Sequence, residues 1–241
     1  MTSADPGADR GAPTPKPGRG ALFTLPSRFR AAVFDMDGLL VDSEPLWALA
    51  ERELLMRHGE HFTPADAEAT HGRSIEDTIA AYARRLGGVD PTDLRTELMM
   101  LMRTHYAERL ALRPGARELV RSLEGRVALG VASNTDGALV RLALDKVGLL
   151  DAFAVIVSGA DIGRAKPCPD VYLAACHALK VEPRYAVAFE DSPVGVRAAK
   201  AAGMTCVGVP ERDGLDLTAA GADVVVGSLA ELVGSRVPGL V

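Results

Sequence analysis

The fold is best understood from residues 33–44, Val33-Phe34-Asp35-Met36-Asp37-Gly38-Leu39-Leu40-Val41-Asp42-Ser43-Glu44. An apolar run from Ala31 to Phe34 predicts a buried strand, which ends in two carboxylates one residue apart. Strand alternation would point Asp35 and Asp37 the same way. Their like charges would repel, and Mg²⁺, which prefers carboxylate oxygens, would remove that repulsion. The structural alternative is a solvated junction between a strand and a turn.

Three later segments carry polar groups that suit phosphate chemistry. Two are apolar runs that end in polar residues, and the third is a lysine followed by proline. They are Val127–Ala132 followed by Ser133 and Asn134, Ala165-Lys166-Pro167, and Ala186–Phe189 followed by Glu190 and Asp191. Because ligands of an open α/β sheet bind at the carboxyl ends of its strands, we expect these side chains to lie near Asp35 and Asp37.

Together, the four segments resemble the four motifs of the haloacid dehalogenase-like (HAD) phosphohydrolases, in the same order. The resemblance covers Arg30 to about Leu232. Within that superfamily, FDMDGLLVDSEPLW (residues 34–47) is most similar to the small sugar phosphate and polyol phosphate phosphatases related to β-phosphoglucomutase. Four motifs in order, each at a strand end or in a loop, are far more specific than one.

The resemblance implies a role for each charged residue of the motifs. Asp35 would attack phosphorus and form an aspartyl phosphate. Asp37 would protonate the leaving alkoxide and then deprotonate the attacking water. Mg²⁺ would be held by Asp35, the main-chain carbonyl of Asp37 and Asp191, with Glu190 in support. Lys166 would balance the charge of the nucleophile and the phosphate.

Ser133 and Asn134 would donate hydrogen bonds to phosphoryl oxygens. Each core assignment also has a structural alternative. A hydroxyl at a strand end is common, and a lone lysine is usually solvated. An acidic pair such as Glu190-Asp191 is favoured at a helix N-terminus by the helix dipole. The prolines beside Lys166 fix the adjacent backbone, which suits a positioned side chain better than a free one.

Short apolar runs alternate with amphipathic stretches from Ala31 onward, which predicts a parallel sheet with intervening helices. The expected strands are Ala31–Phe34, Val127–Ala132, Val155–Ser158, Ala186–Phe189, Thr205–Val209 and Val224–Val226. The expected helices of this region begin near Pro114, Asp136, Pro169, Pro193 and Ser228. The predicted fold class is α/β, a parallel-sheet Rossmann-like HAD core with an inserted α-helical cap domain.

The predicted domain organisation has three parts. Residues 1–28 are rich in Gly, Pro, Ala and Asp, and we expect a disordered N-terminal extension there. Residues 29–44 and 113–241 would form the HAD core domain. Residues 45–112 contain no strand-like run, carry helical apolar spacing, and would form the helical cap domain.

The cap is expected to choose the substrate. His71-Gly72-Arg73-Ser74 resembles the cap loop that meets substrate in this group, so His71 and Arg73 are candidate substrate-binding residues. Arg73 could grip a hydroxyl or a second anionic group, or lie on the surface. Glu44, at the end of the first motif, is a further candidate. Trp47 could line a pocket or pack in the cap, and we favour packing.

Composition narrows the function classes. The chain has 241 residues, of which 48% are hydrophobic and 24% are charged, as in ordinary globular enzymes. The net charge of −5 argues against nucleic acid as the main ligand. Three cysteines without metal-like spacing favour a reduced setting, and no run approaches the ~18 apolar residues of a membrane helix. We therefore expect a cytoplasmic monomer whose partner is a small-molecule phosphate monoester.

The expected function is Mg²⁺-dependent hydrolysis of a sugar or polyol phosphate. A phosphosugar mutase like β-phosphoglucomutase shares the core residues, but such enzymes carry a histidine where Trp47 stands and a cap arginine where Ile75 stands. Haloacid dehalogenases lack the second aspartate, and phosphonoacetaldehyde hydrolases use a cap lysine, which is absent between Pro45 and Leu112. A non-catalytic, ligand-binding relative is a further alternative, although such proteins typically lose a motif acid.

Overall fold

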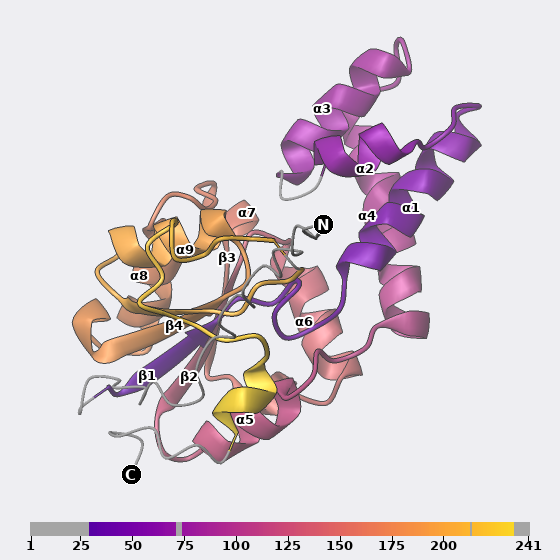
Figure 1. Ribbon diagram of the computed structural model, residues 1–241. Helices are drawn as coiled ribbons and strands as arrows, with labels where there is room; N and C mark the ends of the chain where they lie inside the picture. Colours follow the sequence, from indigo (N-terminus) through magenta and orange to yellow (C-terminus); the bar gives the residue numbers. More distant parts are fainter. Residues whose placement is uncertain (1–28, 71–73, 213, 234–241) are drawn as a thin grey trace, which may run out of the picture.

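The computed structural model describes residues 29–70, 74–212 and 214–233 (Figure 1). Within these residues, six parallel strands form one sheet in the order β3-β2-β1-β4-β5-β6. The strands are β1 (Ala31–Phe34), β2 (Ala128–Ser133), β3 (Val155–Ser158), β4 (Ala186–Glu190), β5 (Thr205–Gly208) and β6 (Val224–Val225). All bounds lie within one residue of the prediction, because strands of a parallel sheet are buried on both faces and appear as continuous apolar runs.

Helices cover both faces of the sheet. One core cluster joins Ala32 and Phe34 of β1 to helices on one face, and a second joins Ala31 and Val33 to helices on the other. The helices of the first cluster are α5 (Ala116–Leu123) and α6 (Gly137–Lys146), and those of the second are α8 (Asp170–Ala178) and α9 (Pro193–Ala201). The side-chain alternation of a strand therefore builds a three-layer α/β/α core, and the predicted fold class is confirmed.

Most predicted helix starts are correct, because their capping residues are visible in the sequence. Ser192 accepts a hydrogen bond from the Gly195 N–H (3.1 Å), and Pro193 is the first residue of α9. Shorter elements were not predicted, since a single turn shows no apolar periodicity. These are η1 (Leu150–Ala152), α7 (Gly159–Ile162) and η2 (Pro183–Tyr185), while the helix expected near Ser228 is the 3₁₀ turn η3 (Leu229–Leu232).

A helical insertion separates β1 from β2 in the sequence. It comprises α1 (Glu44–Arg57), α2 (Pro64–Thr70), α3 (Ile75–Arg85) and α4 (Pro91–Arg109). Helices α1 and α3 pack against α4, and α4 in turn packs against α6 of the core. In Figure 1 the insertion projects away from the sheet. No strand lies between Glu44 and Arg109 in the described residues, as expected, while the domain boundaries at residues 45 and 112 stay a prediction.

The two connections to the insertion run side by side. Val41 and Leu112 form an antiparallel bridge. The Asp42 N–H donates to the Ala111 carbonyl and the Arg113 N–H donates to the Leu40 carbonyl, each at 2.9 Å. The chain therefore leaves the core and returns to it through a short two-stranded ribbon, next to the end of β1.

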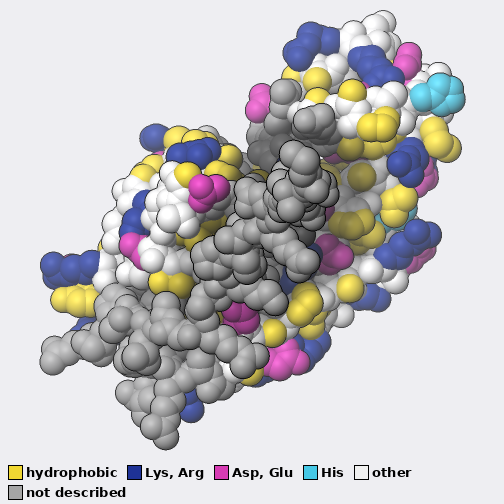
Figure 2. All heavy atoms as spheres, in the orientation of Figure 1, with side chains coloured by type: hydrophobic (Ala, Val, Ile, Leu, Met, Phe, Trp, Pro, Cys, Tyr) yellow, Lys and Arg dark blue, Asp and Glu magenta, His cyan; other side chains and the backbone are white. Residues whose placement is uncertain are grey.

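Two sequence-based expectations concern the exterior. None of the helices in the described ranges has the length and apolar character that crossing a bilayer would require. On the face drawn in Figure 2, basic side chains are scattered over both parts of the molecule rather than gathered in one surface. The predicted N-terminal extension, residues 1–28, lies outside the described residues.

Candidate active site

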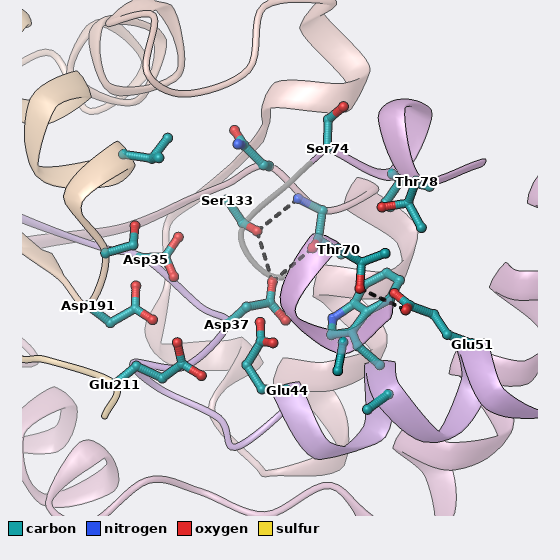
Figure 3. Close-up of a pocket in the computed structure, with 18 of the residues that line it drawn as sticks. Asp35, Asp37, Glu44, Glu51, Thr70, Ser74, Thr78, Ser133, Asp191 and Glu211 are labelled. Carbon is teal, nitrogen blue, oxygen red and sulfur yellow. Dashed lines mark hydrogen bonds between the residues drawn. The ribbon is translucent and has the colours of Figure 1, made fainter. Parts of the chain in front are cut away.

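A pocket of about 530 Å³ lies between the carboxyl ends of the central strands and the helical insertion. Residues that end or follow β1, β2 and β4 line one side, and residues of α1, α2 and α3 line the other. Figure 3 shows Asp35 and Asp191 on the sheet side, and Thr70, Thr78 and Glu51 on the insertion side. The pocket thus occupies the edge at which parallel α/β sheets bind their ligands.

Three acidic side chains meet on the sheet side. Carboxylate oxygens of Asp35, Glu190 and Asp191 lie within 4.8 Å of one another, and all three residues are buried. Burial raises the pKa of Asp35 and of Asp191 well above the ordinary carboxyl value, and repulsion from neighbouring carboxylates raises both further. Buried like charges of this kind are costly without a cation, and an all-oxygen donor set fits Mg²⁺.

Lys166 partly neutralises this group. Its Nζ donates to Asp35 Oδ1 (2.5 Å) and to Glu190 Oε1 (2.6 Å), and the side chain is 4% exposed. Burial alone would lower the pKa of Lys166, but the two carboxylates outweigh burial and raise that pKa. The lysine is therefore charged at neutral pH. Asn134 Oδ1 holds its backbone by accepting a hydrogen bond from the Lys166 N–H (2.7 Å).

Two glycines allow the acids to come together. Gly38 has a φ of +75°, a conformation that favours glycine, and a Cβ there would overlap the carboxylate of Asp191. Gly195, in the first turn of α9, lies so close to Glu190 that a Cβ would overlap its carboxylate. Both glycines are therefore required by close approach to a carboxylate, a reason that the sequence alone does not show.

The Asp37 carboxylate lies apart from the acidic group and accepts hydrogen bonds from four hydroxyls. Ser43 Oγ (2.7 Å) and Tyr106 OH (2.9 Å) donate to Oδ1. Thr135 Oγ1 (2.8 Å) and Ser133 Oγ (3.3 Å) donate to Oδ2. Asp35 and Asp37 both line the pocket, but the side chain of Asp35 lies in an ionic environment and that of Asp37 lies among hydroxyls.

The other predicted residues are placed as follows. Glu44, Ser133 and Asn134 line the pocket together with Asp35, Asp37, Asp191 and Lys166, whereas Glu190 is fully buried and does not line it. Trp47 was expected to pack in the cap in preference to lining a pocket. It packs against the main core cluster and also lines the pocket. His71 and Arg73 lie outside the described residues.

Several residues that line the pocket or contact its acids were not predicted. Thr135 directly follows Ser133-Asn134, so its position at the end of a strand could have indicated it. Glu51 lies in α1, a few residues after Trp47, and Tyr106 lies in α4, far from the motifs in sequence. Nothing local distinguishes either residue. The same holds for Tyr172 of α8, whose hydroxyl donates to Glu190 Oε1 (2.5 Å).

Comparison with known proteins agrees with this geometry. The family model described as haloacid dehalogenase-like hydrolase matches residues 32–209. Validoxylamine A 7'-phosphate phosphatase of Streptomyces hygroscopicus subsp. limoneus is 33% identical over 205 residues, which cover 85% of this chain and 96% of the relative. Hexitol phosphatase B of Escherichia coli is 33% identical over 215 residues, covering 87% and 97%.

A solved structure is similar over most of the chain. CbbY from Rhodobacter sphaeroides, crystallised in complex with phosphate, is 30% identical to this chain, with a TM-score of 0.76. The match covers 85% of this chain and 96% of CbbY. The chain belongs to the haloacid dehalogenase-like hydrolases, and the family predicted from the motifs is confirmed.

Proposed function

We propose that this hydrolase is a Mg²⁺-dependent phosphatase that cleaves a small sugar or polyol phosphate through an aspartyl phosphate on Asp35. The observation that carries the proposal is the contact of Asp35 with a buried, charged Lys166 within a group of three acids. The relatives named as phosphatases of phosphorylated small molecules support it. The fold alone would not support the proposal, because one fold hosts many reactions.

Asp35, Glu190 and Asp191 would hold the metal, together with the main-chain carbonyl of Asp37 by family resemblance. Bound there, Mg²⁺ would supply positive charge that lets a dianionic phosphate approach an anionic nucleophile. The raised pKa values of Asp35 and Asp191 support this assignment, because a cation would favour their ionised forms.

In the first half of the reaction, a carboxylate oxygen of Asp35 forms a bond to phosphorus while the bond to the alcohol oxygen breaks. Lys166 contacts the nucleophile and offsets negative charge as the phosphoryl group arrives. Asp37 donates its proton to the departing alkoxide, which leaves as a neutral alcohol. The pocket places Asp37 beside Ser133 on the sheet side, next to where the phosphoryl group would sit.

In the second half, water attacks the aspartyl phosphate. Asp37, now ionised, accepts the proton of that water, and the bond between phosphorus and the Asp35 oxygen breaks. The products are orthophosphate and free Asp35. The four hydroxyls around Asp37 can hold its carboxylate in place through both proton transfers, because hydroxyls both donate and accept hydrogen bonds.

The helical insertion would act as the cap that contacts the alcohol part of the substrate. Its helices supply one wall of the pocket, while Asp35, Asp191 and Lys166 are on the other. Trp47 lines the pocket where mutases of this group carry a histidine, which supports hydrolysis over the mutase alternative.

A panel of phosphate monoesters, assayed for orthophosphate release with Mg²⁺ and with excess EDTA, tests the proposal. We expect Mg²⁺-dependent turnover of at least one sugar or polyol phosphate and none after chelation. Ca²⁺ should not replace Mg²⁺, since it takes more ligands at longer distances. Full activity after exhaustive chelation, or no activity on any ester including p-nitrophenyl phosphate, would contradict it.

A further inference from the structure

The insertion side of the pocket contains a buried carboxylate that the proposed reaction does not use. Glu51 of α1 is only 6% exposed and lines the pocket. Thr70 Oγ1 (2.9 Å) and Tyr82 OH (2.8 Å) both donate to its Oε2. Among the described residues, Oε1 receives no hydrogen bond, so one acceptor of a fixed carboxylate is left to the pocket.

The charge of Glu51 has no opposite partner in the described part of the chain. Its hydrogen bonds there come from the two hydroxyls, and no lysine, arginine or histidine of those ranges forms an ion pair with it. A buried carboxylate with incomplete hydrogen bonding is costly, and that cost falls when a donor arrives. In Figure 3 the side chains of Glu51 and Thr70 face the pocket, which is where such a donor would come from.

The insertion side of the pocket suits a neutral, hydroxylated group. Thr78 and Ser74 add hydroxyls, and Trp47 adds an aromatic surface. Among the described residues, the insertion contributes one other charged side chain to the pocket, that of Glu44. None of the described residues that line the pocket from the insertion is cationic. An anionic group placed beside Glu51 would meet its carboxylate, whereas the cations among the described lining residues, Lys166 and Arg212, belong to the core.

We infer that Glu51 selects the alcohol part of the substrate. Its Oε1 accepts a hydrogen bond from a substrate hydroxyl, so the enzyme takes neutral, hydroxyl-rich phosphate monoesters and rejects esters whose alcohol carries a second negative charge. The inference rests on the proposed phosphatase function and adds a charge rule to it. Discrimination of this kind uses a repulsive element against the wrong ligand as well as an attractive one for the right ligand.

A matched pair of substrates isolates the charge rule. Sorbitol-6-phosphate and 6-phosphogluconate share a six-carbon hydroxylated chain and a phosphate, and differ in one terminal group, which is a hydroxymethyl in the first and a carboxylate in the second. We expect the kcat/KM of the parent enzyme to favour sorbitol-6-phosphate by about tenfold or more, the size of effect of a charged hydrogen-bonding partner.

Glu51→Gln tests the residue itself. A glutamine keeps an oxygen for Thr70 and Tyr82 but places an N–H₂ donor where Oε1 was, so it removes the repulsion and can bind a carboxylate. We expect the preference for sorbitol-6-phosphate to shrink by about tenfold. Glu97→Gln is the matched control, because Glu97 pairs with Arg57 and His58 and does not line the pocket. The Glu97→Gln variant should prefer sorbitol-6-phosphate as strongly as the parent does.

The outcomes separate the two proposals. No turnover of p-nitrophenyl phosphate by the parent with Mg²⁺ would contradict the phosphatase function. Turnover without preference, or with preference for 6-phosphogluconate, would overturn only the inference and would favour the anion-binding role predicted for Arg73. The inference would also be overturned if a Glu51→Gln variant with the circular dichroism spectrum of the parent kept the parent's preference for sorbitol-6-phosphate. If that variant does not fold, the substrate preference of the parent enzyme decides.

Discussion

At the scale of single residues, the pocket gives two aspartates of one short motif different partners. Asp35 contacts a charged lysine within a group of acids, whereas Asp37 contacts only hydroxyls among the described side chains. Substitutions that keep size and remove charge should therefore have different consequences at the two positions.

Asp35→Asn should abolish turnover and leave the fold intact. An amide cannot form the acyl phosphate, while its size matches that of the carboxylate. Orthophosphate release should fall to background, and the circular dichroism spectrum should match that of the parent. A variant that keeps a tenth or more of the parent rate would refute the assignment of Asp35 as nucleophile.

Asp37→Asn should slow turnover by about 10²–10⁴-fold, the usual contribution of a positioned proton donor. The loss should be smallest for p-nitrophenyl phosphate, whose leaving group needs little protonation, and largest for an alkyl ester such as a polyol phosphate. Rates for the two ester classes give the answer. Equal losses would mean that Asp37 serves the fold or the metal instead of proton transfer.

At the scale of elements, the first turn of α9 is shaped around an acid of the site. Ser192 caps the helix, Pro193 begins it, and Gly195 leaves room for the Glu190 carboxylate. This combination could be predicted in part. The cap and the proline are local signals, but the need for glycine arises from a side chain on the neighbouring strand end.

Gly195→Ala should destabilise the protein, although alanine normally stabilises a helix relative to glycine by roughly 0.5–1 kcal/mol. The new Cβ would overlap Glu190, and overpacking of this kind costs about 1–3 kcal/mol. Chemical denaturation should show a lower midpoint, and Mg²⁺ should bind more weakly. A higher midpoint with unchanged Mg²⁺ affinity would show that Glu190 can move aside freely.

The other elements show the same contrast between signals that are local in sequence and contacts that tertiary packing decides. All six strands and the polar groups at their ends could be predicted, because buried apolar runs and the residues after them are adjacent in sequence. Tyr106 and Glu51 could not be. Their helices show that one face is buried, but only tertiary packing decides that Tyr106 meets Asp37 and that Glu51 faces the pocket. Sequence patterns therefore locate the sheet side of the pocket better than its insertion side.

At the scale of the whole molecule, stability should depend jointly on pH and Mg²⁺. Asp35 and Asp191 have raised pKa values in the fold, chiefly through burial, so the folded state binds protons more tightly than the unfolded chain. Without metal, the contribution of these groups is present at low pH and is lost as pH rises through the raised pKa values. Mg²⁺ binds the ionised carboxylates, so it should restore the stability that the folded state loses as pH rises.

Thermal unfolding with EDTA and with Mg²⁺ between about pH 5 and about pH 8 measures this coupling. The rise in Tm caused by Mg²⁺ should grow with pH, and matched ionic strength in sodium chloride should not reproduce it. A Mg²⁺ effect that is constant or shrinks toward high pH would argue against a metal site built on these carboxylates.

The ribbon formed by Val41 and Leu112 has a consequence for how such a protein can diversify. Because the chain leaves and re-enters the core at adjacent residues, the helical insertion can be replaced by one of different length without disturbing the register of the strands. A hybrid that joins this core at Val41 and Leu112 to the corresponding segment of a relative should keep its sheet, provided the donor segment covers α6 as α4 does. We expect such a hybrid to take its substrate preference from the donor of the insertion and its reaction from the recipient core. Recombination at this junction would then produce enzymes with new substrate preferences.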